Sequence, residues 1–181
     1  METERYLMIE KAGEIIMKSG IQELTIKNLA TELVVSENIL YNQLTKDDDI
    51  LLLILKDFEI ELKEYIHSVA NKRETPETEL KLLFKGLYFL FLQKPYYLSI
   101  IFDKSLKDKD DRIRYAILKI VTIAENHLFK IINAGKTRNS FQSGVPTRKL
   151  VAKILSDFRL FMKDEQLVNE MIMKLKTLKE Q

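Results

Sequence analysis

Residues 25–44, TIKNLATELVVSENILYNQL, decide how the rest of the chain is interpreted. Ile26, Leu29 and Ala30 are three and one positions apart, so they share one face of a helix over residues 26–33. Ser36 follows a short apolar run and favours the N-cap of a second helix, over residues 37–42. The apolar face of that second helix would comprise Ile39, Leu40 and Leu44. Two short helices joined by a tight turn are typical of a helix-turn-helix, whose second helix enters the DNA major groove.

A wider pattern of apolar, small and hydroxyl residues surrounds this stretch. Its positions are Arg5, Met8, Ile9, Ala12, Ile15, Ile16, Gly20, Thr25, Leu29, Ala30, Leu33, Val35, Ser36, Leu40, Tyr41, Ile50 and Leu51. In this spacing they resemble the N-terminal domain of the TetR family of transcriptional repressors. The resemblance implies a helix-turn-helix DNA-binding domain over residues 1–48. It also implies a helical ligand-binding and dimerisation domain over residues 49–181.

The whole chain is expected to be all-α. Its 181 residues include only five Gly and three Pro, and no segment alternates convincingly between apolar and polar residues. We expect nine helices, at about residues 4–19, 26–33, 37–42, 47–71, 76–92, 95–103, 110–134, 146–162 and from 166 onward. Loops are expected over residues 104–111 and 135–146.

Composition excludes several classes of function. The chain has no Cys, which rules out disulfides, thiolate metal sites and a cysteine nucleophile. Its two His are far apart in sequence, which argues against a zinc site. No phosphate-binding loop or catalytic motif is present, so we expect neither an enzyme nor a bound cofactor. Apolar runs fall far short of the ~18 residues of a membrane span, and no signal peptide is seen, so we expect a cytoplasmic protein without a membrane partner.

The outward face of the second helix and the resemblance together give the residues expected to face double-stranded DNA. These are Thr25, Ser36, Glu37, Asn38, Tyr41, Asn42 and Lys46. Asn can bond adenine through two hydrogen bonds, and Tyr, Thr and Lys can bond phosphate. The alternatives are that Thr25 and Ser36 act only as helix caps, and that the asparagines form an ordinary solvated face.

Three departures from the family pattern favour a second interpretation. Val34 stands where the family has its turn glycine, and Asp47 stands where it has a phosphate-contacting lysine. Gln43 and Leu44 replace the family's His-Phe pair. Residues 1–49 also carry ten acidic and five basic residues, whereas DNA-binding modules are normally basic. The alternative is therefore a protein that keeps this fold, has lost DNA binding and acts through protein–protein contacts.

The remaining expected sites lie in residues 49–181. The resemblance implies a cavity for a small amphipathic effector, for which the candidate lining residues are His67, Phe84, Tyr88, Phe91, Tyr97, Phe102 and His127. The alternative is that the aromatic residues form an ordinary core. Two apolar stripes near the C-terminus predict a helical hairpin, and the resemblance implies that this hairpin pairs with a second copy. Its candidate interface residues are Val151, Ile154, Leu155, Phe158, Leu167, Met171 and Leu175. Packing within the monomer is the alternative. The expected function is a dimeric, ligand-responsive regulator, a repressor that binds a pseudo-palindromic operator.

Overall fold

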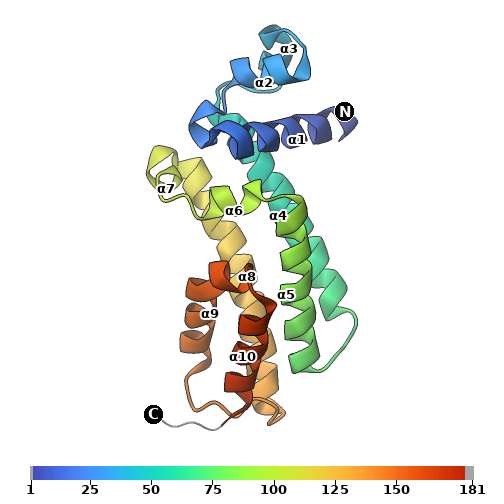
Figure 1. The fold of residues 1–181 in the computed structure, drawn as a ribbon, viewed down its shortest axis with the longest axis vertical. Coiled ribbons are helices and arrows are strands. Elements are labelled where there is room, and N and C mark those ends of the chain that lie inside the picture. The colour runs from blue at the N-terminus through green and yellow to red at the C-terminus, as the bar shows by residue number, and fades with distance from the viewer. Residues whose placement is uncertain (1, 178–181) are drawn as a thin grey trace. The chain divides into compact units, whose positions relative to one another are not determined.

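The computed structural model describes residues 2–177, with the side chains of all of these except 2, 3 and 107. Every regular element in the described part of the chain is a helix, which confirms the all-α class (Figure 1). The N-terminal elements are α1 (Glu2–Ser19), the 3-10 helix η1 (Ile21–Glu23), α2 (Ile26–Leu33) and α3 (Glu37–Tyr41). The others are α4 (Asp48–Ala70), α5 (Pro76–Gln93), α6 (Tyr96–Ile101), α7 (Leu106–Lys109), α8 (Asp111–Thr137), α9 (Thr147–Phe161) and α10 (Glu165–Lys176).

Nine of these α-helices correspond to the nine that the sequence predicts. The stretch expected to be a loop over residues 104–111 instead contains one short helix, α7. The last expected loop starts later, because α8 continues to Thr137 rather than ending near Ala134. These differences fall at helix ends and in a short charged segment, where local sequence signals are weakest.

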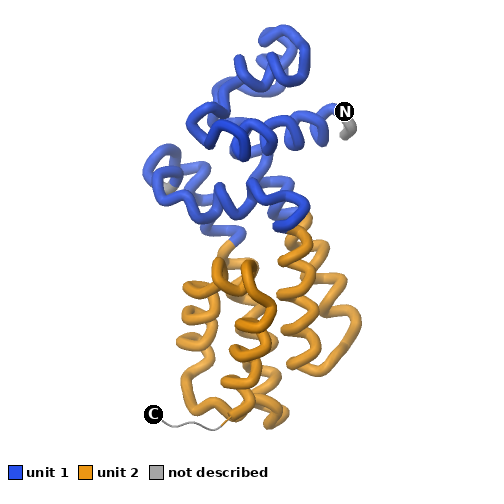
Figure 2. The backbone as a smooth tube through the Cα atoms, in the orientation of Figure 1, with its two compact units in different colours: residues 1–60, 91–120 blue, residues 61–90, 121–181 orange. Residues whose placement is uncertain are grey.

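The chain divides into two compact units (Figure 2). Unit 1 comprises Met1–Ile60 and Phe91–Ile120, and unit 2 comprises Glu61–Leu90 and Val121–Gln181. Helices α4 and α8 each contribute one end to each unit. The expected division into residues 1–48 and 49–181 concerns function, and it stays a prediction.

Unit 1 is built on the apolar stripe of α1. The buried members of this stripe are Met8, Ile9, Ala12, Ile15 and Ile16. Gly13 lets α6 approach closely, because a Cβ at this position would lie 2.3 Å from ring atoms of Tyr96. The Tyr96 hydroxyl also donates to the Glu10 carboxylate at 3.1 Å. The first helix is therefore held by both α2 and α6.

Unit 2 contains the second half of α4, most of α5, the second half of α8 and the α9–α10 hairpin. Gly86 of α5 lies against the ring of Tyr65, whose hydroxyl donates to the carbonyl of Leu82. The hairpin helices α9 and α10 lie side by side (Figure 1). The loop before α9 is hydrogen-bonded to α10, since the backbone amides of Gln142 and Ser143 both donate to the Leu175 carbonyl. Among the described residues, no helix has both the length and the apolar character needed to cross a membrane.

Candidate DNA-binding and ligand-binding sites

The turn between α2 and α3 has the left-handed backbone that the sequence pattern calls for. Val34 has φ 56° and ψ 45°, and its amide donates back to the last turn of α2. Its side chain is 91% exposed. A β-branched residue is unfavourable in this conformation because its Cβ crowds the backbone. The helix-turn-helix geometry is thus formed, and Val34 is strained within it.

Helix α3 exposes both polar and apolar side chains to solvent. Glu37, Asn38, Tyr41 and Asn42 are exposed, as the sequence predicts for residues that face DNA. Two expectations about this helix are wrong. Ile39 is 51% exposed rather than part of an apolar face, because only Leu40 of the first turns points into unit 1. Ser36 occupies the N-cap position, but its side chain accepts no capping hydrogen bond.

The start of α2 carries two oxygen acceptors. Thr25 is the N-cap, and its hydroxyl accepts from the Asn28 amide at 3.1 Å, which confirms its capping role. The Asp47 carboxylate accepts from the Ile26 amide at 2.7 Å. Free amides at a helix N-terminus are a natural site for an anion such as phosphate. Here an internal carboxylate already occupies one of them, which sequence reasoning did not foresee.

Lys46 is engaged within unit 1. Its Nζ lies 2.8 Å from Asp110 Oδ2 and 3.6 Å from Asp48 Oδ2. Lys109 reaches Asp48 at 3.0 Å, and this joins the start of α4 to α7. The side chain that the resemblance assigns to DNA phosphate is thus held by carboxylates, although it remains half exposed.

Arg112 completes this network of alternating charges. It pairs with Asp49 at 3.1 Å and with Asp110 at 3.1 Å. The Asp49 carboxylate also caps the start of α4, and its bond from the Thr45 hydroxyl is the largest cause that lowers the Asp49 pKa to about 2. Hydrogen bonds from Arg112, then from Lys46, hold the Asp110 pKa well below its usual range. The acidic triplet of residues 47–49 therefore serves capping and ion pairing. Within the described residues, no group of three or more His, Cys, Asp or Glu is placed to hold a metal ion.

The seven candidate ligand residues do not gather at one place. Phe91 and Tyr97 belong to the core of unit 1, where both rings pack against Phe58. The Tyr97 hydroxyl donates to Asp57 at 2.8 Å. Phe102 is half-buried just after α6. The structure favours the core alternative for Phe91 and Tyr97, because both rings are buried against Phe58 of another helix and leave little surface for a ligand.

His67 and His127 do come together. They line a pocket of about 450 Å³ in unit 2, named here the His pocket, between α4, the start of α5 and α8. Its lining is Lys63, Ile66, His67, Ala70, Glu79, Ile123, His127, Lys130, Ile131 and Ala134. Burial, followed by the nearby Lys130 charge, lowers the pKa of His127, so its imidazole is neutral near pH 7. Burial raises the pKa of Glu79, against the opposing effect of Arg138.

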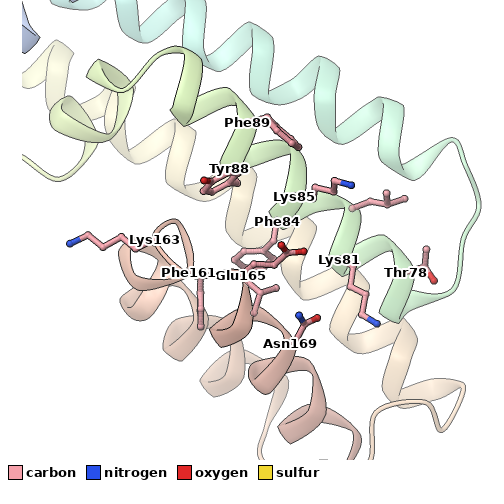
Figure 3. Close-up of a pocket in the computed structure, with 12 residues that line it drawn as sticks. Thr78, Lys81, Phe84, Lys85, Tyr88, Phe89, Phe161, Lys163, Glu165 and Asn169 are labelled. Atoms are coloured by element: carbon pink, nitrogen blue, oxygen red, sulfur yellow. The ribbon is translucent and has the colours of Figure 1, made fainter.

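Phe84 and Tyr88 line a second hollow of about 300 Å³, named here the outer pocket (Figure 3). It lies between α5 and the α9–α10 hairpin. Phe84 and Phe161 meet edge to face there, with ring centroids 5.5 Å apart. Figure 3 shows Glu165 beside these rings, while Lys163 extends away from them.

A small apolar cavity of about 20 Å³, named here the apolar cavity, shares Ile66 with the His pocket and Phe84 with the outer pocket. Its lining is Leu62, Ile66, Leu83, Phe84, Leu87, Ala124, Leu128, Leu155 and Phe158. Two candidate interface residues, Leu155 and Phe158, thus face the interior of unit 2. No local signal could have separated them from the rest of their stripe, because the choice depends on where α4, α5 and α8 lie.

The outer face of the α9–α10 hairpin carries a groove of about 390 Å³, named here the hairpin groove. Four candidate interface residues line it, namely Ile154, Leu167, Met171 and Leu175. Val151, Ile154 and Leu175 are buried within the single chain, so they have little surface left for a partner. Leu160, which sequence reasoning missed, lines the same groove and is 53% exposed.

No family model matches the chain, and neither does any curated protein. Solved structures do match it over nearly its whole length. A TetR/AcrR-family transcriptional regulator from Thermobifida fusca is 13% identical with a TM-score of 0.72, covering 99% of this chain and 100% of the other. The ketosteroid transcriptional regulator KstR2 of Mycobacterium tuberculosis is 12% identical with a TM-score of 0.78, covering 98% and 97%. The regulator FadR from Bacillus subtilis, in complex with stearoyl-CoA, is 19% identical with a TM-score of 0.72, covering 97% and 99%.

The fold is that of the TetR-family regulators. The TetR fold therefore stands on structural similarity as well as on the spacing of residues 5–52. At such low identity the likeness concerns the backbone arrangement. The roles of individual side chains must be argued from this chain alone.

Proposed function

We propose that the protein is a DNA-binding transcriptional regulator that responds to a small ligand. The observation that carries this proposal is the exposed helix α3, which follows a left-handed turn at Val34. Asn38, Tyr41 and Asn42 offer hydrogen-bonding groups on its outer side. A short helix exposed in this way suits entry into the DNA major groove, where such groups can bond base edges and phosphates.

The structural neighbours support both parts of the proposal. They are transcriptional regulators rather than enzymes, and one of them is a complex with stearoyl-CoA. A ligand that binds one conformation better than another shifts the protein toward it. Helix α4 is the natural carrier of such a shift, because it starts at the helix-turn-helix and ends beside the His pocket. We propose that ligand binding lowers operator affinity, so that the protein acts as a repressor in the cytoplasm.

Dimerisation belongs to the same proposal. A second copy would cover the hairpin groove, where Leu160 is exposed and Leu167 and Met171 are half-buried. Two-fold symmetric pairs are the commonest oligomers. Two copies of α3 in one dimer would read two half-sites about 34 Å apart, and the operator would be pseudo-palindromic.

Two observations favour the alternative function, a protein of this fold that acts through protein contacts. The Asp47 carboxylate occupies the Ile26 amide, and Lys46 is paired with Asp110. Both arrangements place negative charge close to the expected phosphate positions. A negatively charged surface weakens DNA binding, because phosphate neutralisation supplies most of the nonspecific affinity.

A selection from random duplex DNA separates the two functions. Full-length protein is incubated with a randomised duplex pool at about 50 mM salt, and recovered sequences are titrated by fluorescence anisotropy. The regulator is expected to select two related half-sites and to bind more weakly as salt rises. Replacing the exposed Asn38 by Ala should weaken the selected site about tenfold, since a bidentate base contact is worth about 1–3 kcal/mol. The Asn133→Ala variant on α8 is the matched control. Absence of binding at about 50 mM salt would leave the alternative function.

A further inference from the structure

The helix-turn-helix segment has very few cations with which to bind DNA phosphates. Lys46 is the sole Lys or Arg in residues 28–55, and it lies in the turn that follows α3. Its side chain is 51% exposed, so solvent reaches the ammonium group. Because phosphates border the groove that a recognition helix enters, a cation just beyond such a helix is well placed to contact them. The partner of Lys46 therefore matters for the DNA affinity of unit 1.

In the structure this cation is already engaged by a carboxylate from the junction between α7 and α8. Lys46 Nζ lies 2.8 Å from Asp110 Oδ2 and 3.6 Å from Asp48 Oδ2. The hydrogen bond to Asp110 is also the largest cause that raises the pKa of Lys46. Asp48 is shared with Lys109, whose Nζ lies 3.0 Å from its Oδ1. Asp110 is therefore the nearer partner of Lys46.

Both ends of the Lys46–Asp110 contact are held in place by other hydrogen bonds. The Lys46 backbone amide donates to Asp49 Oδ2 at 3.2 Å. The Asp110 side chain is only 10% exposed, and it accepts from the Arg112 amide at 2.7 Å and from the Arg112 guanidinium at 3.1 Å. Isolated surface ion pairs contribute little, but pairs within a network of charges contribute more. The fixed Asp110 carboxylate is therefore an effective competitor of phosphate for Lys46.

We infer that the Lys46–Asp110 ion pair is an autoinhibitory contact that holds DNA binding below the affinity of which α3 and its flanking turn are capable. Lys46 has to give up Asp110 before it binds phosphate, and the phosphate has to approach the Asp110 charge. A conformational change that moves Asp110 away from Lys46 would raise DNA affinity. The inference rests on the proposed function, because it describes how this chain limits its own contact with DNA.

The Asp110→Asn variant tests the contact, because it removes the charge and keeps an oxygen that can accept from the Arg112 amide. It should bind the duplex recovered from the randomised pool about fivefold more tightly, which is the upper range for an exposed ion pair. Its log–log salt dependence should steepen by about 0.9, the effect of one added phosphate contact. Asp111→Asn is the matched control, because Asp111 is 87% exposed and pairs with Arg114. Equal gains in the two variants overturn the inference.

A double-mutant cycle assigns the gain to Lys46. In the parent, Lys46→Ala should leave DNA affinity nearly unchanged, because Asp110 already engages the lysine. In Asp110→Asn, the same replacement should cancel both the gain in affinity and the steeper salt dependence. A gain that survives Lys46→Ala overturns the inference, since the overall charge of unit 1 then explains it. Circular dichroism checks the fold of each variant, and Asp110→Ser, which also keeps a capping oxygen, replaces Asp110→Asn if that variant is unfolded.

A measurement without DNA keeps this inference distinct from the proposed function. Amine labelling with a succinimidyl ester, followed by peptide mass spectrometry, gives the reactivity of Lys46, with the exposed Lys27 as internal reference. Asp110→Asn should accelerate labelling of Lys46 and leave Lys27 unchanged, because the hydrogen bond that raises the Lys46 pKa is weakened. Equal labelling rates overturn the autoinhibitory contact even if the protein binds DNA. Faster labelling, with neither protein binding the randomised pool, overturns the proposed function and the inference with it.

Discussion

At the residue scale, Val34 adopts a left-handed backbone that is unfavourable for a β-branched side chain. Its left-handed backbone is required by the α2–α3 turn, yet its side chain is almost fully exposed and contributes no burial. A non-glycine residue in this region is disfavoured by about 1–2 kcal/mol. The TetR pattern places glycine at this point, and the structure shows that the chain makes the same turn without it.

We therefore expect Val34→Gly to stabilise the protein. Relief of the strained backbone should exceed the entropy cost of glycine, for a net gain of roughly 1 kcal/mol. Urea denaturation monitored by circular dichroism measures the change. Val35→Gly is the control, because Val35 does not have a positive φ and should be destabilised by glycine. A lower stability of Val34→Gly than of the parent would contradict the argument.

The effect of the Asp47 charge on DNA affinity can be separated from the effect of its capping hydrogen bond on stability. Its carboxylate caps α2 beside the surface proposed for DNA. Asp47→Asn keeps an oxygen acceptor but removes the charge. It should raise DNA affinity several-fold and reduce stability by no more than about 1 kcal/mol, the usual worth of a cap. Anisotropy and urea denaturation measure the two effects.

Asp164 provides the matched control for Asp47. Its carboxylate also accepts from a helix N-terminal amide, that of Gln166 at 2.8 Å, but it is the N-cap residue of its own helix, α10, and belongs to unit 2. Asp164→Asn should cost similar stability and leave DNA affinity unchanged. Equal DNA affinities for Asp47→Asn and the parent would show that the carboxylate does not oppose phosphate.

At the scale of elements, the start of α4 is tied to α7 and α8 by charge. The Asp49 carboxylate accepts from the Thr45 hydroxyl, from the Thr45 and Lys46 amides, and from Arg112, so its pKa falls to about 2 from an unfolded value near 3.8. A depressed carboxyl pKa stabilises the folded state above the unfolded value, and that stability is lost as pH falls through the folded value. The contribution should therefore be complete above about pH 4 and disappear toward pH 2.

Acid denaturation tests this coupling. Urea midpoints of the parent should fall steadily between about pH 4 and pH 2, and those of Asp49→Asn should fall less over the same window. Asp111→Asn serves as the control, because Asp111 is exposed and, among the described residues, its ion pair is with Arg114 on its own helix. Parallel pH dependences of the urea midpoint for the parent and Asp49→Asn would show that the Asp49 carboxylate does not contribute to the acid sensitivity.

At the scale of the whole molecule, the hairpin groove is where the proposed dimer can be tested. Leu160→Glu places a charge in the hairpin groove, at a side chain that is already 53% exposed in the single chain. If a second copy covers the groove, the variant should elute as a monomer and bind the operator at least tenfold more weakly. Light scattering coupled to gel filtration measures the mass.

Leu118→Glu on α8 is the comparison for that experiment, since Leu118 is as exposed as Leu160 but lies outside the groove. It should leave the mass unchanged. If the parent protein is already monomeric at micromolar concentration, the hairpin groove is not a stable dimer interface.

The amino-acid sequence by itself determined the features that depend on neighbours along the chain. Helix positions follow from apolar spacing, the Thr25 cap follows from residue type, and the left-handed turn falls where the spacing puts it. Only the tertiary structure decided which side chains from distant segments meet. Lys46 reaches Asp110, Asp47 reaches Ile26, and His67 lies in one pocket with His127 while Tyr97 packs in another unit. The physical reason is that periodicity assigns a residue to a face of its helix, whereas its partner depends on which helix packs there.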